Sequence, residues 1–211
     1  MVTTTIRHPT APERHRMELL PLLVKAFSRW GYRKTTTARL AECCGVQEVE
    51  LYRAWPSKRE MFMAAIDHVF EQTRAEWEAL LPPDEKRTEK TMTTMAQRLL
   101  SHQSLHQGDH GLYRIIFAGL SELDAPDIRR AMRRLYRKFH RYVVQLIEQH
   151  RSGNGKPVDA KAIARDAWAM VGLAAVCDIG RSLGMLKCFE RHELMAGVGK
   201  QLLEGVDDSK R

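Results

Sequence analysis

A short stretch of the chain, residues 40–51, has the spacing of a helix-turn-helix. Ala41 is small where two helices must cross closely, and Gly45, four residues later, suits a left-handed turn between them. Val46 and Leu51 are placed to pack the second helix on the first. The chemistry of such a unit is recognition, because its second helix can enter a major groove and read base edges. The spacing alone is a weak signal, so the flanking residues decide its weight.

Two other sets of side chains stand at helical spacing. His102, His106 and His110 are four residues apart and could hold a metal ion with Asp109, but Gly108 is expected to end that helix first. We predict no metal and no cofactor. A second set forms a basic stripe on the side of a helix opposite its apolar stripe. These side chains could bind an anionic ligand or nucleic acid. The simpler interpretation is a solvent-exposed face paired with acidic residues. The stripe consists of Arg129, Arg130, Arg133, Arg134, Arg137, Lys138 and Arg141.

Enzymatic chemistry has no support in the sequence. The chain contains no nucleophile elbow, no P-loop and no glycine pattern for a dinucleotide. Its scattered Ser, His and Asp residues do not define a triad. We therefore expect a binding protein and not an enzyme.

The segments that flank the helix-turn-helix strengthen the assignment. Gly31-Tyr32-Arg33-Lys34-Thr35-Thr36-Thr37 precedes it, and Leu51-Tyr52-Arg53-Ala54-Trp55-Pro56-Ser57-Lys58 follows. This arrangement resembles the TetR family of bacterial regulators, whose pattern is a glycine-aromatic pair, a Thr-Thr pair, a small-residue turn and Leu-Tyr-x-x-Phe-Pro-Ser-Lys. The resemblance covers residues 19–65; beyond them it rests on helix count and chain length.

The resemblance implies roles for individual residues. Thr36 and Thr37 would meet a phosphate at a helix start, and Tyr52 and Lys58 would contact phosphates by a hydroxyl and a charge. Trp55 stands where the family has Phe and would be a core anchor. The reading helix would enter the major groove. The predicted DNA-binding residues are Thr36, Thr37, Gln47, Glu48, Glu50, Tyr52, Arg53 and Lys58.

The reading helix also departs from the family pattern. The family commonly has Ser, Lys and Gly-Thr where this chain has Gln47, Glu48 and Val49-Glu50. Two carboxylates repel phosphates, although Glu can accept a hydrogen bond from cytosine. Acidic residues also favour a helix N-terminus, so these two could serve the fold alone.

Apolar residues recur at helical spacing almost everywhere, which predicts an all-α fold of about nine helices and no sheet. We expect an N-terminal three-helix DNA-binding domain at residues 1–60 and a helical ligand-binding and dimerisation domain at 61–211. In the first helix, Pro21 predicts either a kink or a start near Leu20, and Gly31 ends it. Ser57 and Glu60 form a capping box for the fourth helix. The expected helices span about 13–30, 37–43, 47–53, 57–81, 88–106, 112–123, 126–150, 159–183 and 191–204.

The family resemblance also predicts two sites in the second domain. Apolar and aromatic side chains would line a pocket for a small, largely apolar ligand, although side chains at such spacings more often form plain core. The predicted pocket residues are Trp77, Met95, Leu99, Tyr113, Phe117, Phe139, Tyr142 and Met170. The last two long helices would form a four-helix interface with a second copy, the alternative being an intrachain core. The interface residues would be Trp168, Val171, Ala175, Ile179, Leu194, Val198 and Leu202.

The bulk composition agrees with a DNA-binding protein. The 211 residues carry a net charge of +8, and residues 1–63 hold 11 basic against 6 acidic side chains, so most of the excess lies in the predicted DNA-binding domain. No signal peptide or membrane-spanning segment is expected, and the four cysteines suggest a reduced, cytoplasmic protein with mostly buried thiols. We therefore predict a ligand-responsive repressor that binds palindromic double-stranded DNA as a homodimer. The alternative is a dimeric ligand-binding or protein-interaction module with a decayed DNA-binding head, and activation in place of repression is also open.

Overall fold

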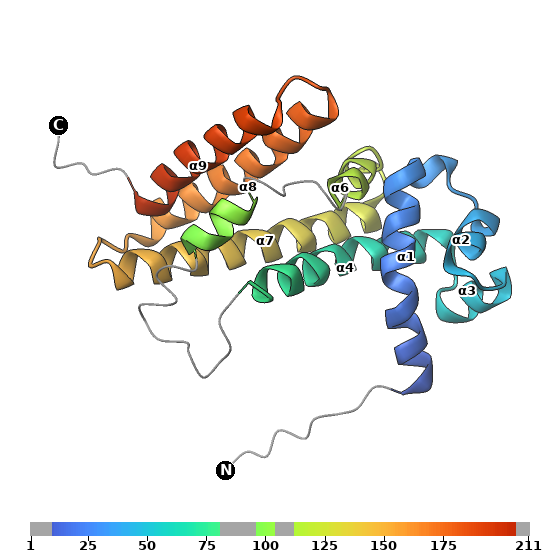
Figure 1. Cartoon of the computed structure of the whole chain (residues 1–211). Helices are drawn as coiled ribbons and strands as arrows, with labels where there is room; N and C mark the ends of the chain where they lie inside the picture. Colours follow the sequence, from blue (N-terminus) through green and yellow to red (C-terminus); the bar gives the residue numbers. More distant parts are fainter. Residues whose placement is uncertain (1–9, 81–95, 104–111, 206–211) are drawn as a thin grey trace, which may run out of the picture. The chain divides into compact units, whose positions relative to one another are not determined.

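A computed structural model describes residues 10–80, 96–103 and 112–205. These residues form helices joined by turns, and no strand occurs among them, which confirms the all-α prediction (Figure 1). The helices are α1 (Ala11–Lys34), α2 (Thr37–Cys44), α3 (Glu48–Ala54), α4 (Lys58–Glu78), α6 (Leu112–Leu120), α7 (Pro126–Gly153), α8 (Ala160–Ser182) and α9 (Cys188–Glu204). Residues 96–103 are also helical. Within these ranges no helix combines the length and the apolar character needed to cross a bilayer.

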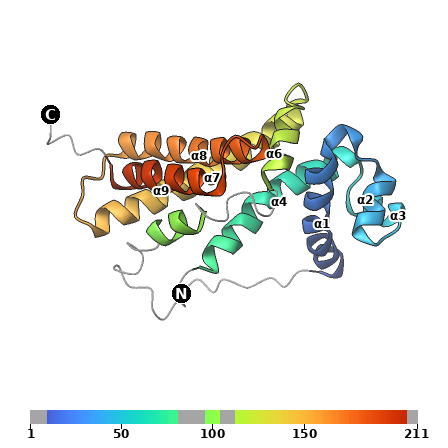
Figure 2. The same ribbon diagram turned by 45° about the horizontal axis from the view of Figure 1, so that its top comes forward.

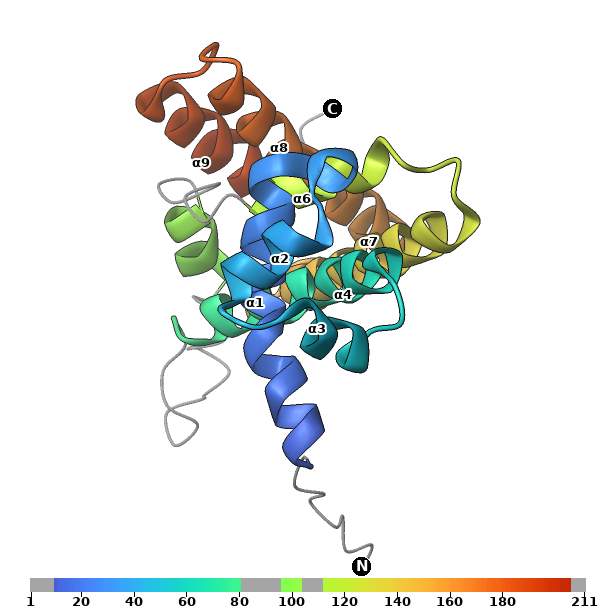
Figure 3. The same ribbon diagram turned by 90° about the vertical axis from the view of Figure 1, so that its right-hand side faces the viewer.

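The chain divides into two compact units, and α4 and α7 contribute residues to both. The first unit comprises residues 1–69 and 114–132, and the second comprises residues 70–113 and 133–211. In the first unit the short helices α2 and α3 lie beside α1 (Figure 3). Its core contains the fully buried Leu23, Phe27 and Phe62, with the Phe27 and Phe62 rings edge to face at 4.9 Å. Such aromatic pairs add to the gain from burial.

The first helix begins earlier than the sequence predicted. Thr10 caps it, since its backbone N–H donates to the Glu13 carboxylate (2.7 Å) and its Oγ1 accepts from the Glu13 N–H (3.4 Å). The backbone N–H of Thr10, and its hydroxyl, which donates to the same carboxylate (2.9 Å), lower the pKa of Glu13. The helix runs through Pro21, so of the two alternatives for this residue the start near Leu20 is wrong. Pro21 lies on the exposed side, where water can satisfy the carbonyl that loses its donor. Gly31, at φ 73° and ψ 176°, interrupts the helical geometry, but α1 continues to Lys34, beyond the predicted end at Trp30.

Other helix ends follow their local signals within a few residues. Ser57 Oγ accepts from the Glu60 N–H (3.2 Å) at the start of α4, as its capping box predicts. Asp159 caps α8 by accepting from the Lys161 N–H (3.0 Å). In contrast, α7 continues to Gly153, so the loop predicted from residue 151 begins later. Of the helix predicted at 88–106, only residues 96–103 lie within the described ranges.

In the second unit, α8 and α9 lie side by side (Figure 2). One core cluster joins the helical segment 96–103 to α7, α8 and α9; it contains Ala96, Val143, Ile147, Ile163, Ala167 and Leu203. Each of these residues loses most of its apolar surface to the others, which is the main source of stability for the unit.

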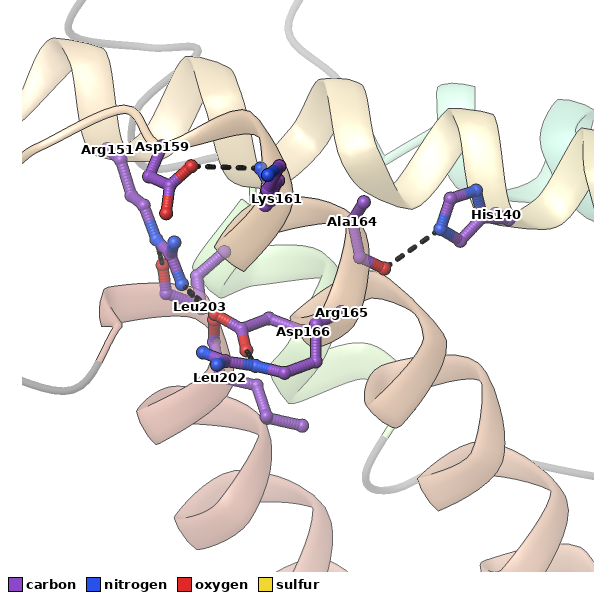
Figure 4. Close-up of polar contacts among 9 residues, drawn as sticks. All are labelled: His140, Arg151, Asp159, Lys161, Ala164, Arg165, Asp166, Leu202 and Leu203. Carbon is purple, nitrogen blue, oxygen red and sulfur yellow. Dashed lines mark hydrogen bonds and ion pairs between the residues drawn. The ribbon is translucent and has the colours of Figure 1, made fainter.

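A buried arginine ties together the ends of three of these helices. Arg151, near the end of α7, places its Nη2 2.6 Å from the Asp166 carboxylate of α8. The same guanidinium donates to two carbonyls at the end of α9, Leu202 O (2.8 Å) and Leu203 O (3.2 Å). Figure 4 shows this side chain between Asp166 and the end of α9. A buried charge is tolerated only when it is paired and hydrogen-bonded in this way.

The cysteines are divided equally between exposed and buried positions, which corrects the expectation that most are buried. Cys43 and Cys188 are exposed, while Cys44 and Cys177 are buried. Burial raises the pKa of Cys44 to about 11 and also raises that of Cys177. All four are free thiols.

This division predicts the thiol reactivity of the native protein. At pH 8 a thiol with a pKa of about 11 is ionised on the order of one part in a thousand. Two thiols should therefore react rapidly with Ellman's reagent, and the other two should react at least about 100-fold more slowly until the protein is unfolded. Cys43→Ser should leave one fast thiol. Four fast thiols in the native protein would contradict the structure.

Candidate nucleic-acid interface

The helix α2 is capped at both ends, and its C-terminal cap forms the turn that leads into α3. Thr36 caps α2 by accepting from the Arg39 N–H (3.2 Å), which leaves its own hydroxyl proton free to donate. Gly45 ends α2 at φ 66°, in the left-handed region, and donates its N–H back to carbonyls of the helix. A residue with a Cβ would be strained at this φ, so Gly45 allows the tight turn that the sequence predicted. Thr37 is the first residue of α2 and is half-buried.

The helix α3 has a buried and an exposed side. Leu51 and Ala54 are buried against the rest of the first unit. Glu48, Val49, Tyr52 and Arg53 are exposed, with Val49 54% and Tyr52 46% accessible. Gln47 stands at the N-cap, also exposed. We name Gln47, Glu48, Val49, Tyr52 and Arg53 the α3 face.

The two carboxylates of α3 have different surroundings. Glu50 Oε1 accepts from the Gln47 N–H at 3.0 Å and so caps the helix. Its other oxygen lies 3.9 Å from His15 Nε2 of α1. Glu48 is exposed and lies on the α3 face. Only one of the two therefore stands among the side chains free to meet a ligand, while the other serves the fold.

A pair of substitutions separates these roles. Glu50→Ala should lower the free energy of unfolding by about 1 kcal/mol, because α3 loses its cap. Glu48→Ala has the same change in helix propensity but loses only a dipole interaction, so its cost should stay below about 0.5 kcal/mol. Urea unfolding followed by circular dichroism measures both. Equal losses would mean that the Glu50 cap contributes nothing.

Lys58 is held by the end of α1. Its Nζ donates to Tyr32 O (3.1 Å) and Thr35 O (3.0 Å) and lies 4.5 Å from the centre of the Tyr32 ring. A cation at these carbonyls complements the helix dipole. An ammonium has three donors, so one remains for an outside acceptor. Sequence reasoning assigned Lys58 to a phosphate and missed this inward role, because its partners are 23 and 26 residues away.

Two further residues were missed by the sequence reasoning. Val49 is the most exposed apolar side chain of α3, and such a side chain suits the methyl group of a thymine. Arg39 of α2 is exposed, with its guanidinium carbon 5.7 Å from the centre of the Trp30 ring. Arg39 follows the capping Thr36 by three residues, and that spacing is the signal that could have identified it.

Comparison with known proteins agrees with this geometry. Residues 22–65 match the model described as bacterial regulatory proteins, tetR family. The fold of most of the chain matches as well: a putative TetR-family transcriptional regulator from Rhodococcus sp. superposes with a TM-score of 0.72 over 90% of this chain and 98% of that one, at 14% identity. Residues 22–65 therefore form a DNA-binding domain of the TetR family, and the chain has the fold of TetR-family regulators. It is accordingly a regulator of the DNA-binding, helix-turn-helix type.

Two other comparisons are with a relative in sequence and with a solved structure. The nucleoid occlusion factor SlmA of Aliivibrio fischeri (strain MJ11) is 29% identical over 159 residues, which cover 74% of this chain and 79% of the relative. The transcriptional regulator FadR from Bacillus subtilis, solved in complex with stearoyl-CoA, superposes with a TM-score of 0.61 at 14% identity and covers 90% of this chain and 99% of that one. At that identity the structural likeness shows the fold alone.

The predicted ligand-pocket residues fall into several groups. Trp77, Leu99 and Tyr142 pack in one cluster, and Phe139 lies 6.1 Å from the Trp77 ring. Met170 packs instead against the cluster around Ile147. Tyr113 and Phe117 are both half-buried on α6, but Phe117 belongs to the first unit. Met95 lies outside the described residues. Trp77 Nε1 is buried without a hydrogen-bond acceptor among the described residues.

The predicted dimer residues all retain exposed surface on α8 and α9. Trp168, Ile179 and Val198 are exposed, and the other four, Val171, Ala175, Leu194 and Leu202, are half-buried. Trp168 stacks on His140 of α7 at 4.4 Å, and His140 Nε2–H donates to Ala164 O (2.9 Å; Figure 4). The sequence reasoning missed Val176, Leu183, Met185 and Phe189, which are 53–72% exposed. We name Trp168, Val176, Ile179, Leu183 and Val198 the α8–α9 face.

Proposed function

We propose that the chain is a repressor that binds a palindromic operator as a homodimer through the α3 face. Residues 1–60 would serve as the DNA-binding domain and residues 61–211 as the ligand-binding and dimerisation domain. The observation that carries the proposal is the division of α3, in which Leu51 and Ala54 fix the helix while the α3 face stays exposed. A helix anchored on one side and free on the other fits a major groove.

Each side chain of the site has a defined chemistry toward DNA. Thr36 and Tyr52 can donate hydroxyl protons to phosphates, with Thr37, Arg53 and the third proton of Lys58 beside them. Gln47 can read adenine, Glu48 can accept from cytosine N4, and Val49 can contact a thymine methyl. The network at Glu50 sets the start of α3 and so positions these groups.

Selection of random duplex DNA by the purified protein, followed by titration across salt, tests this proposal. An enriched palindrome whose affinity falls steeply with salt is the expected result. No enrichment, or weak binding that ignores sequence, would instead support the alternative, a dimeric module with a decayed head. If a palindrome is enriched, Glu48→Gln should change the preferred base at one position of each half-site and leave the other positions unchanged.

Removing the Tyr52 hydroxyl should weaken binding without changing specificity. Tyr52→Phe loses a hydrogen bond to a charged group, which is worth about 1.5–3 kcal/mol, so affinity should fall roughly tenfold or more on every sequence. Fluorescence anisotropy with the selected duplex and with a one-base variant measures this. An unchanged affinity would remove Tyr52 from the interface, and an altered base preference would make it a reading residue.

The homodimer is supported by the α8–α9 face. Its five residues put large apolar surface into water in a single copy, and a second copy related by a two-fold axis would cover both faces at once. The two-fold axis also agrees with a palindromic operator. Size measurement by light scattering distinguishes a dimer from a monomer directly.

The ligand site is proposed around Trp77, Phe139 and Tyr142. Their rings form an apolar cluster with one buried donor, the Trp77 indole, which a ligand acceptor would satisfy. FadR, with stearoyl-CoA, gives a fold neighbour whose ligand carries a long apolar chain. Titration with acyl-CoA esters of increasing length should quench tryptophan fluorescence in the wild type and not in Trp77→Phe. A ligand that binds without altering operator affinity would contradict regulation, since switching requires unequal affinity for two states.

A second candidate function is nucleoid occlusion, favoured by the similarity to SlmA over 79% of that relative. Both functions use DNA binding, so in vitro selection does not separate them. Deleting the gene in its host should change transcription beside the bound sites if the protein is a repressor. Unchanged transcription, together with division septa over nucleoids, would favour nucleoid occlusion.

A further inference from the structure

The middle of α7 carries an exposed row of arginines in the second unit. Arg133, Arg137 and Arg141 follow one another at four-residue intervals, about 6 Å apart along the helix axis, and all three are exposed. We name them the α7 basic face. No acidic residue occurs in α7 between Ile128 and Ile147. The opposite side of the helix, including Leu135, Val143 and Ile147, is buried.

Among the described residues, these arginines have no acidic partners of the kind that a solvated face commonly has. Lys138, beside them, is paired with Glu71 of α4 at 2.9 Å. Within the part of the chain that the structure describes, no carboxylate lies within ion-pair distance of the α7 basic face. The contact found there is from Arg141 Nε to the Arg137 backbone O (3.4 Å). Like charges four residues apart destabilise a helix, so stability does not explain this arrangement.

The chemistry of the face limits the partner. Arginine forks match phosphate and carboxylate oxygens. A protein interface gains most of its affinity from buried anchors such as Trp and Tyr, yet no residue of α7 is among the large apolar side chains that are exposed in the described ranges. An interfacial membrane helix would insert its apolar side, which here is already buried in the core. Duplex DNA needs only charge at regular spacing.

We propose that the α7 basic face binds the phosphate backbone of duplex DNA without sequence preference, as a contact separate from the α3 face. It would add nonspecific affinity to the whole protein. The proposal does not depend on an operator, because phosphates are present on every duplex and contacts to them carry no sequence information.

The test compares two triple variants of the full chain that lose equal charge. Arg133→Gln, Arg137→Gln and Arg141→Gln remove the face, while Lys161→Gln, Lys187→Gln and Lys200→Gln remove three exposed lysines of α8, its following loop and α9. Anisotropy with a duplex of random sequence is measured from low to moderate salt. The first variant should reduce the slope of log K against log salt by about 2.7 per protomer, and the second should leave it unchanged. Equal slopes in both variants would overturn the proposal.

A second background separates this proposal from the proposed function. In a protein carrying Tyr52→Ala and Arg53→Ala, operator preference should be lost while binding that depends on the α7 basic face remains. If that background binds no duplex even at low salt, the α7 contact does not exist. Polyglutamate and vesicles containing phosphatidylserine serve as competing probes at the same salt. Binding to either that exceeds duplex binding and requires the three arginines would assign the face to that partner and overturn the DNA proposal.

Discussion

Replacing Ile179 with Glu is expected to lower operator affinity by about two to four orders of magnitude. Ile179 is 41% exposed in the single chain, so a carboxylate there meets water and does not disturb the fold. In the proposed dimer this position would be buried against the second copy of the chain, where an unpaired charge is strongly unfavourable. A monomer would bind each half-site independently and lose the gain in effective concentration that two linked reading helices provide.

Val158 supplies the matched control. It is apolar and 52% exposed, but it precedes α8 and lies outside the α8–α9 face. Val158→Glu should leave both the dimer and operator binding unchanged. Light scattering and anisotropy on the same samples distinguish the outcomes. A monomeric Ile179→Glu protein with full operator affinity would show that dimerisation is not needed, and a variant that remains dimeric would place the interface elsewhere.

The fold was largely predictable because its signals are local. Helical periodicity gave the all-α class, and short-range chemistry gave the end of α2 and the start of α4, where Gly45 and Ser57 act within four residues of their partners. The doubt over Pro21 arose because the sequence does not tell which side of the helix faces water. Its exposed position makes the missing N–H tolerable.

The candidate site was less predictable because its partners are distant in sequence. Tyr52 and Arg53 are exposed as their pattern suggests, but Lys58 donates to Tyr32 and Thr35 across a helix junction. Glu50 could equally have been a reading residue or a cap, and only the hydrogen bond to the Gln47 N–H at 3.0 Å separates it from Glu48. Both distinctions depend on geometry that residue type alone does not encode.

The buried Arg151 carries the second large expected effect. Arg151→Ala should lower the free energy of unfolding by about 3–5 kcal/mol, because it leaves the Asp166 carboxylate buried with a diminished set of partners. It also leaves the Leu202 and Leu203 carbonyls without their donor. Arg165, which contacts Asp166 at 3.1 Å, is 71% exposed and does not replace it. Arg165→Ala is therefore the matched control, with an expected loss below about 1 kcal/mol.

The cost of losing Arg151 should be concentrated at α9. Two of the three bonds from its guanidinium end on carbonyls of that helix, so hydrogen exchange in α9 should accelerate more than in α2 or α3. Replacing both charges, as Arg151→Met with Asp166→Leu, removes the uncompensated carboxylate and should recover part of the stability. Urea unfolding measures the three variants together. If Arg151→Ala and Arg165→Ala lower the free energy of unfolding equally, the bond from Arg151 to Asp166 adds nothing to stability. If the double variant is no more stable than Arg151→Ala, the loss of stability comes from the lost carbonyl contacts and not from the buried charge.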